Sequence, residues 1–153
     1  MIEKARAGDV QEILAVINSS NRQAFKKVIP PPHFKEPILS LAQLRDDFER
    51  MTFYVCRQGG KIVGVAALHV QSAETGRIRW VYVLPGHQRR GVGTALVTFL
   101  EGQAREMGLS RLRLLTTAKA RWAVNFYQKL GYRLAEKVER PWGFDVFMEK
   151  GLT

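Results

Sequence analysis

Cysteine is nearly absent from this sequence, because Cys56 is the single one among 153 residues. One cysteine excludes an internal disulfide, and chains without disulfides are typical of reducing compartments. No apolar run approaches the roughly 18 residues that a transmembrane helix needs. The first residues also lack the apolar core of a signal peptide. We therefore expect a cytoplasmic protein that does not enter a membrane.

Acidic residues are also scarce. The chain has 14 Asp and Glu against 24 Lys and Arg, which gives a net charge of +10 with His neutral. Such an excess favours polyanions such as nucleic acid, anionic lipid or a phosphate-rich cofactor. The basic residues are scattered and form no basic tail, so the charge describes the surface field without identifying a partner.

Two kinds of catalytic pattern are missing as well. No group of His, Cys, Asp and Glu has the spacing of a metal site, and neither a Ser/His/Asp set nor a Cys/His pair is recognisable. We therefore expect no bound metal and no covalent acyl-enzyme. Cys56 follows the apolar residues 53–55, so we predict a small buried side chain there.

The residues that are present suffice for one globular domain. Hydrophobic residues make up 46% of the chain, and the length fits a single domain over residues 1–153. Hydrophobic periodicity predicts the order βααβββαβαββ, a mixed α/β (α+β) fold with a central sheet of six to seven strands flanked by about four helices. The predicted strands cover residues 2–6, 52–57, 61–71, 78–83, 111–117, 132–138 and 144–149, and helices begin near residues 9, 40, 91 and 119.

Local patterns refine this order. Asp9 is expected to cap the first helix, with Glu12 as its capping-box partner. Four prolines predict a long loop over residues 25–40. Residues 74–76, Glu-Thr-Gly, predict a turn. The helix that begins at Gly91 is expected to use one apolar face, made of Val92, Ala95, Leu96, Phe99, Leu100 and Met107.

The most informative segment joins a predicted strand to a predicted helix at residues 83–94. A helix N-terminus presents unpaired backbone N–H groups and a partial positive charge. Glycines allow the backbone to approach a pyrophosphate closely, and two arginines add charge beside it. The segment has neither the pattern of an NTPase P-loop nor that of a dinucleotide-binding loop. It is predicted to bind phosphate, although a glycine-rich turn with solvated arginines remains the plain alternative.

Two motifs resemble one known family. Residues 88–93, Gln-Arg-Arg-Gly-Val-Gly, resemble the Gln/Arg-x-x-Gly-x-Gly/Ala signature of the GNAT acetyltransferases. Residues 123–132, Ala-Val-Asn-Phe-Tyr-Gln-Lys-Leu-Gly-Tyr, resemble that family's Ala-x-x-Phe/Leu-Tyr-x-x-x-Gly-Phe/Tyr. The resemblance spans residues 2–149. It implies a GNAT fold, acetyl-CoA as co-substrate, and direct transfer of an acetyl group to a primary amine of a small molecule or a peptide.

The resemblance also implies where acetyl-CoA binds. The backbone of Val81, Tyr82 and Val83 is expected to hold the pantetheine arm and the acetyl carbonyl, where developing negative charge needs a hydrogen-bond donor. Asn125 and Phe126 are expected near CoA. The expected pyrophosphate site comprises Gln88, Arg89, Arg90, Gly91, Val92, Gly93 and Thr94.

Tyr127 matches the family position that protonates the departing thiolate, and a phenol has a pKa suited to that task. The family's usual glutamate base is replaced by Arg77, which cannot accept a proton. Glu74 is our candidate for the base. Its alternatives are His69, His87, Asp145, a water chain, or an amine that arrives neutral. The family's usual pantetheine-binding Asn is replaced by Ala120.

Two other functions stay open at this point. The charge of +10 and three tryptophans taken as exposed (Trp80, Trp122 and Trp142) permit a nucleic-acid-binding module. The departures at Arg77 and Ala120 permit an acyl-CoA sensor without catalysis. For the transferase, Arg77, Arg79 and Arg140 suggest an acceptor that carries a carboxylate or phosphate. Members of the family often form homodimers, so a homodimer is a further expectation.

Overall fold

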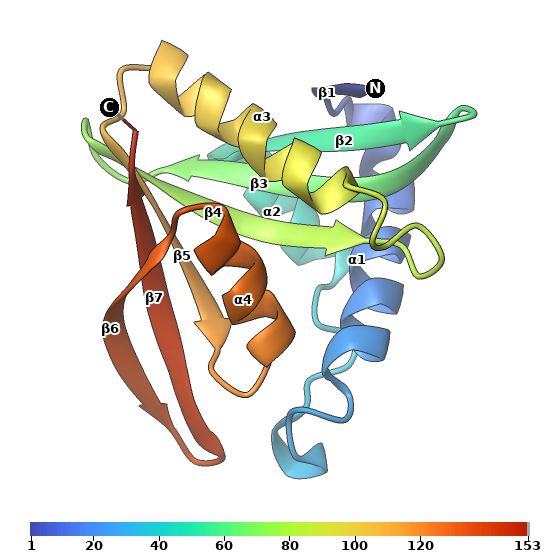
Figure 1. Ribbon diagram of the computed structural model, residues 1–153. Coiled ribbons are helices and arrows are strands. Elements are labelled where there is room, and N and C mark those ends of the chain that lie inside the picture. The colour runs from blue at the N-terminus through green and yellow to red at the C-terminus, as the bar shows by residue number, and fades with distance from the viewer. Residues whose placement is uncertain (153) are drawn as a thin grey trace.

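The computed structural model describes residues 1–152 (Figure 1). Seven strands form one sheet in the order β1-β2-β3-β4-β5-β7-β6. Neighbouring strands are antiparallel except β4 and β5, which are parallel. The strands are β1 (Ile2–Lys4), β2 (Thr52–Gln58), β3 (Lys61–Val70), β4 (Thr75–Val83), β5 (Arg111–Thr117), β6 (Arg133–Arg140) and β7 (Gly143–Gly151). The helices are α1 (Val10–Phe25), α2 (Leu41–Arg50), α3 (Val92–Glu106) and α4 (Arg121–Lys129), with short 3-10 turns at Ala7–Asp9 and Pro31–His33.

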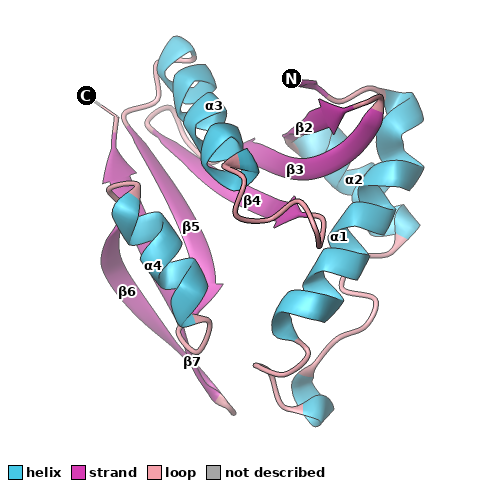
Figure 2. Cartoon of the chain, turned by 45° about the vertical axis from the view of Figure 1, so that its right-hand side comes forward, coloured by secondary structure: helices cyan, strands magenta, loops and turns pink. Residues whose placement is uncertain are grey.

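The helices lie on both faces of the sheet (Figures 1 and 2). Leu96 and Leu100 of α3 and Tyr127 of α4 belong to a core on one face. Ile13 of α1 and Leu44 of α2 belong to a second core on the other. The predicted α/β fold, its order and its mixed sheet are confirmed. None of the helices within residues 1–152 has both the length and the hydropathy that crossing a membrane requires.

Strands β4 and β5 separate after a short paired region. Only Thr75, Gly76 and Arg77 pair with residues 111–113 of β5. Beyond them β4 keeps its antiparallel pairing with β3, while β5 continues beside β7. Figure 2 shows the two strands diverging, with α3 and α4 in front of them. The C-terminal half of β4 therefore has one edge without a partner strand.

A bulge lies in that half of β4. The register against β3 shifts between Val65 and Ala67, and Trp80 has a φ of +54°. A positive φ is unfavourable for a bulky L-residue, so surrounding contacts must hold it. The indole Nε1 of Trp80 donates to Asp47 Oδ2 on α2 at 3.0 Å, and Asp47 is buried. Helix α2 thus fixes the bulge from outside the sheet.

The predicted capping box at the start of α1 is wrong. The Asp9 side chain does not cap α1; its Oδ2 accepts from the Arg6 N–H at 2.9 Å and from Arg57 Nη2 at 2.7 Å. Glu12 instead accepts from the Ile62 N–H on β3 at 2.8 Å. Both carboxylates serve contacts with the sheet that a local pattern cannot reveal. A capping box does form at α2, between Ser40 and Gln43.

Three other predictions also need correction. The turn predicted at residues 74–76 lies earlier, because Thr75 and Gly76 are buried in β4. A Cβ on Gly76 would come within 3.0 Å of three leucine side chains, so this glycine serves packing. On α3, Ala95 is exposed and Met107 is 47% exposed, while Val97 and Ala104 are buried in their place. The predicted loop over residues 25–40 is broken by the single turn at Pro31–His33.

Candidate functional site

The unpaired edge of β4 presents backbone groups to the space that β5 leaves. The Leu84 N–H donates to the Val63 carbonyl of β3 at 2.8 Å. Successive residues in a strand direct their backbone groups to opposite edges. Val83 and Val81 therefore direct N–H and C=O toward the opening, whereas the backbone of Tyr82 faces β3. The Gln88 side chain donates to the Val83 carbonyl at 3.1 Å.

The loop after β4 carries a run of free backbone donors. Within residues 1–152, no acceptor receives a hydrogen bond from the backbone N–H groups of residues 88–94. These residues end at the first turn of α3, so the helix dipole adds to their positive potential. Arg89 and Arg90 are exposed beside them. A run of this kind is suited to a pyrophosphate, whose oxygens are strong acceptors.

Two glycines shape this loop in different ways. Gly91 caps α3 with a φ of +80°, and a Cβ there would meet nothing within 4 Å. Its role is conformational, since a left-handed backbone is unfavourable for other residues. Gly93 has a neighbour instead, because a Cβ would lie 3.3 Å from the Phe126 ring on α4. Phe126 thus braces the start of α3. Val92 is buried under the same turn, and Thr94 is exposed.

Tyr127 lies on α4 in the core that faces α3. Its ring packs edge-on against Phe126, 4.9 Å between centroids, and against Tyr132, 5.8 Å. Among the described residues its hydroxyl has no hydrogen-bond partner. Burial, with a smaller contribution from Tyr82, raises the pKa of Tyr127 above its ordinary value. The hydroxyl therefore stays protonated at neutral pH and can donate that proton.

The remaining residues singled out by the sequence, Asn125, Ala120 and Glu74, lie in different parts of the fold. Asn125 lies on the exposed side of α4. Ala120 is fully buried at the N-cap of α4 and offers no polar side chain. Glu74 is exposed at the start of β4, seven residues from Val81, which is roughly 20 Å at about 3.3 Å per residue. Glu74 thus does not lie beside Val81.

The other candidate bases differ in whether their side chains already have a hydrogen-bond partner. Asp145 accepts from Arg140 Nε at 2.8 Å and is therefore engaged. His87 and His69 each have a buried Nδ1 without a partner among residues 1–152. Burial, together with Arg79, Arg50 and Arg77, lowers the pKa of His69. His69 is thus neutral at pH 7. It lies opposite Arg77, which is four residues before Val81 on β4.

Two residues near the opening were not singled out by the sequence, namely Asn21 and Thr117. The Tyr82 hydroxyl donates to Asn21 Oδ1 of α1 at 2.8 Å. Thr117, the last residue of β5, is buried, and its Oγ1 has no partner among the described residues. These residues lie far apart in the chain, so no local pattern could have indicated them.

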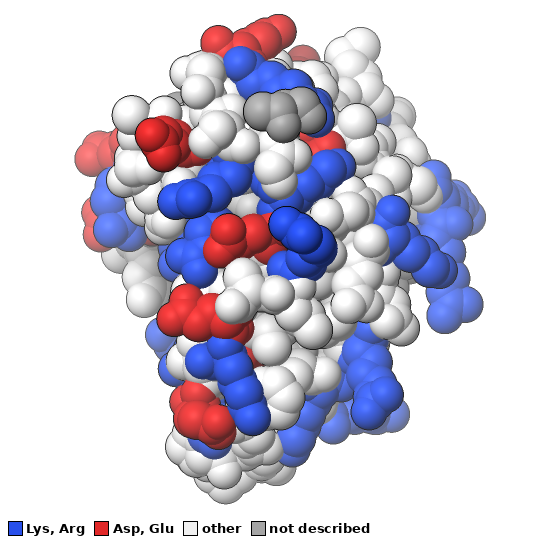
Figure 3. Space-filling view, turned by 60° about the vertical axis from the view of Figure 1, so that its left-hand side comes forward, with Lys and Arg blue, Asp and Glu red and all other residues white. Residues whose placement is uncertain are grey.

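Aromatic contacts connect the elements on either side of the opening. Phe25 at the end of α1 packs against Trp122 of α4, 5.5 Å between centroids. His33 lies 5.1 Å from Trp142, in the turn between β6 and β7. The expectation of three exposed tryptophans is wrong for two of them, because Trp80 and Trp142 are half-buried and only Trp122 is 55% exposed. The surface that carries β6 and β7 shows basic side chains interspersed with acidic ones (Figure 3).

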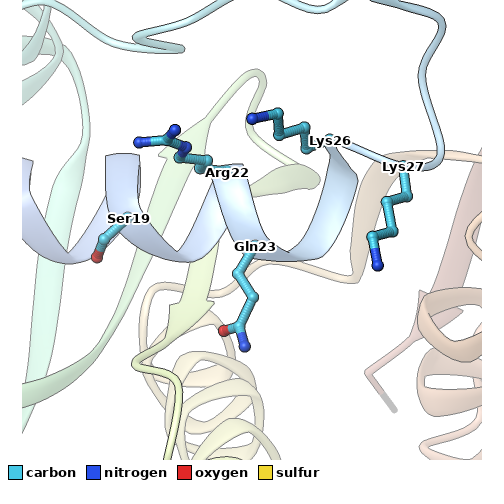
Figure 4. A pocket seen from close by; sticks show the side chains of 5 residues that line it. All are labelled: Ser19, Arg22, Gln23, Lys26 and Lys27. Carbon is cyan, nitrogen blue, oxygen red and sulfur yellow. The ribbon is translucent and has the colours of Figure 1, made fainter.

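A shallow hollow of about 560 Å³ lies along α1, lined by five residues shown in Figure 4. Arg22 and Lys26 extend to one side of the helix, and Ser19 and Gln23 to the other. Arg22 forms an exposed ion pair with Glu36 at 3.1 Å. The hollow includes none of the loop residues, and an exposed helix surface of this kind does not mark a reaction centre. Within residues 1–152, no three His, Cys, Asp or Glu side chains gather as metal ligands would.

Comparison with known proteins finds a matching family and several similar proteins. Residues 2–132 match the model of the "Acetyltransferase (GNAT) family". An uncharacterized N-acetyltransferase of Methanocaldococcus jannaschii is 30% identical over 93 residues, which cover 57% of this chain and 41% of that protein. An aminoalkylphosphonate N-acetyltransferase of Salmonella typhimurium is 32% identical over 81 residues, which cover 50% of this chain and 53% of that protein. The chain thus spans about half, or less, of the length of these curated relatives.

The fold has close counterparts among solved structures. The PaiA N-acetyltransferase of Thermoplasma acidophilum, in complex with coenzyme A, has a TM-score of 0.87 to this chain at 18% identity. The match covers 99% of this chain and 98% of that chain. At this identity the likeness concerns the fold, whereas the family match rests on the sequence itself. Because that match covers most of its residues, this chain belongs to the GNAT acetyltransferase family.

Proposed function

We propose that this chain is an acetyl-CoA-dependent N-acetyltransferase that moves the acetyl group directly to a primary amine. The observation that carries the proposal is the run of free backbone N–H groups at residues 88–94, which directly follows the unpaired edge of β4. The first feature suits the pyrophosphate of CoA and the second suits its pantetheine arm. Tyr127, a buried phenol without a partner in the described chain, supplies the proton donor.

The proposed reaction uses backbone and side chain in turn. The Val81 N–H donates to the acetyl carbonyl oxygen, which gains negative charge as the amine nitrogen attacks the carbonyl carbon. The carbon–sulfur bond then breaks, and the leaving thiolate takes the proton of the Tyr127 hydroxyl. The amine gives up its own proton to water, and Tyr127 takes a proton back from water, so that the phenol is restored for the next cycle. The pantetheine arm is held by the Val83 backbone and by the Gln88 side chain, which donates to the Val83 carbonyl.

The partner proposals follow from the same features. The acceptor is an amine that enters between α1 and the β6–β7 hairpin, on the face opposite α3 and α4.

The buried, unpaired Cys56 supports a reducing compartment such as the cytoplasm. Nucleic-acid binding is the second function that the charge supports, and in Figure 3 acidic side chains lie among the basic ones on the left and in the centre but not along the right edge. A homodimer remains to be tested by analytical ultracentrifugation.

The test is a thiol-release assay with acetyl-CoA and a panel of amines, namely polyamines, amino acids, aminoalkylphosphonates and peptides. The Tyr127→Phe variant is measured beside the unchanged protein. Thiol release that depends on one amine class, and that falls about tenfold or more in the variant, supports the proposal. Tight binding of acetyl-CoA without any transfer would favour a sensor. Failure to bind acetyl-CoA would overturn the proposal.

A further inference from the structure

Strand β4 carries two arginines just before its bulge. Arg77 lies opposite His69 of β3 and Arg79 lies opposite Ala67. Ala67 belongs to the core beneath α1 and α2. Residues opposite each other in an antiparallel pair share a face of the sheet, and so do residues two apart in one strand. Both arginines therefore lie on the face opposite α3 and α4.

The two arginines differ from Arg113 and Arg50 nearby in having no carboxylate partner. Arg113 Nε pairs with Glu149 at 3.0 Å. Arg50 pairs with Asp47 at 2.7 Å. No Asp or Glu within residues 1–152 forms an ion pair with Arg77 or Arg79. Arg140, which the sequence grouped with these two, is engaged with Asp145 at 2.8 Å. Of the three arginines that the sequence grouped, only Arg77 and Arg79 thus keep a positive charge without a carboxylate partner.

Arg77 is also enclosed. Its Nε is buried and has no acceptor among the described residues. Its guanidinium lies 5.7 Å from the centroid of the Phe147 ring, and the Arg113 guanidinium lies 4.4 Å from the same ring. Burial and the charges of Arg79 and Arg113 lower the pKa of Arg77. A half-buried cation with a free donor and cationic neighbours is stabilised by an anion.

His69 adds a second free polar atom at the same place. Its Nδ1 is buried without a partner among the described residues, directly across the strand pair from Arg77. A neutral imidazole can donate a hydrogen bond to an anion. Two buried nitrogens from neighbouring strands, Arg77 Nε and His69 Nδ1, thus lack acceptors in one small area.

Arg77, Arg79 and His69 lie to one side of Val81, the proposed reaction centre, toward the start of β4. Arg79 is two residues and Arg77 four residues before Val81, so along the strand they lie about 7 Å and 13 Å from it. The CoA phosphates are expected on the other side of Val81, at residues 88–94. Coenzyme and anion would thus approach Val81 from opposite directions and from opposite faces of the sheet.

We propose that Arg77 and Arg79 form an anion subsite that binds the acidic group of the amine acceptor, a carboxylate or a phosphonate. The inference rests on the proposed transferase function and adds the substrate class to it. A guanidinium binds either acid group through paired hydrogen bonds. The Salmonella relative is named for an acceptor of this chemistry, an amine that carries a phosphonate.

The test compares acceptors that differ only in the acid group. β-Alanine is paired with β-alaninamide, and 2-aminoethylphosphonate with ethanolamine. For the unchanged protein, we expect a KM for one or both acids about tenfold below that of the neutral partner, and the better acid identifies the preferred group. Neutral amines that serve as well as both acids would overturn the subsite.

Variants separate the subsite from the rest of the enzyme. Arg77→Gln and Arg79→Gln should each raise the KM for the acid about tenfold, and leave the KM for acetyl-CoA and for the neutral amine unchanged. Arg77→Lys should recover part of the loss, because it restores charge without the planar fork. Arg133→Gln, an exposed arginine on β6, is the matched control. Equal effects on acid and neutral acceptors would contradict the proposal.

A binding measurement keeps the two proposals distinguishable. Each acid and its neutral partner are titrated calorimetrically into the protein saturated with CoA. Preferential acid binding that Arg77→Gln abolishes supports the subsite, even if no acetyl transfer occurs. Equal binding of acid and amide overturns the subsite and leaves the transferase proposal standing. If the double Gln variant instead loses only salt-sensitive binding of a single-stranded RNA oligonucleotide, these arginines serve nucleic acid and the subsite is wrong.

Discussion

The two ends of strand β4 have opposite roles. At the first end, Gly76 and Arg77 pair with β3 on one side, Thr75–Arg77 pair with β5 on the other, and Thr75 Oγ1 also accepts from Arg111 Nε at 2.7 Å. At the second end, Tyr82 and Val83 pair with β3 alone, Trp80 and Val81 lie at the bulge, and all four residues are only half-buried. One strand thus contributes to the core at its start and presents free backbone groups at its finish.

This difference shows how a sheet can open a binding site without losing its core. Free N–H and C=O groups are unfavourable when buried without partners, so a strand edge is left open only where another molecule or water can bind. The doubly paired end fixes the direction of β4. Asp47 and α2 then fix the bulge, so that Val81 keeps its direction without a neighbouring strand. The following predictions test this division, beginning with the largest expected effect.

Tyr127→Phe tests the open end most directly. Removing the hydroxyl should lower kcat about a hundredfold, because the thiolate must leave without an acid, and should leave acetyl-CoA affinity unchanged. Burial raises the pKa of Tyr127, so the protonated, active form persists to higher pH. For the unchanged protein, kcat should therefore not decline between pH 8 and about pH 10. Steady-state kinetics over this range check both statements, and an unchanged kcat in the variant would remove Tyr127 from the mechanism.

Gly76→Val tests the paired end. The new side chain would clash with Leu68, Leu109 and Leu112, whose atoms lie 2.9 to 3.0 Å from a Cβ at this position. Overpacking of this kind should lower the free energy of unfolding by about 2 kcal/mol. Urea denaturation measures the loss, and kcat per folded molecule should stay the same. A variant with normal stability but reduced kcat would show that the two ends are not separate.

Gly91→Ala tests the loop that follows the open end. Alanine at a φ of +80° costs about 1 to 2 kcal/mol. The loop should therefore hold its N–H groups less well, and the KM for acetyl-CoA should rise about tenfold. Gly102→Ala on α3 is the control, because a Cβ there meets nothing within 4 Å and the helix favours alanine. The same KM in both variants would argue against a conformational role for Gly91.

Asp47→Asn tests whether α2 holds the bulge. The amide oxygen can still accept from the Trp80 indole, but more weakly than a carboxylate. We expect kcat to fall about threefold through a looser Val81 N–H, with no change in the KM for acetyl-CoA. Asp46→Asn, an exposed neighbour on the same helix, should have no effect. If both variants behave alike, the link from α2 to the bulge has no consequence for the reaction.

The sequence predicted those parts that depend on neighbouring residues. Periodicity located every strand and helix, and the glycines with the two arginines located the loop before α3. The capping box at Asp9 and Glu12 shows where such reasoning fails. Its spacing is correct, yet Arg57 and the Ile62 N–H bind those carboxylates in the folded chain. A local pattern indicates which bonds are available and cannot exclude a distant competitor.

The base and the acceptor site show the same limit. Glu74 is near β4 in sequence, but the extended strand places it far from Val81. The sequence did not distinguish Arg77, Arg79 and Arg140 as candidate anion-binding residues. In the structure, Arg140 differs from the other two because it forms an ion pair with Asp145. Charge in the sequence is counted before pairing, whereas a binding site depends on the charge that remains after pairing.

The sequence by itself thus determined the family, the order of elements and the position of the loop proposed to bind phosphate, because each depends on patterns within a few residues. The tertiary structure decided where β4 diverges from β5, that the bulge lies at Trp80, and that Arg77 and Arg79 stay unpaired. These features depend on residues more than thirty positions apart, such as Asp47 with Trp80 and Tyr82 with Asn21. Only the packed sheet and helices bring such residues within hydrogen-bonding distance.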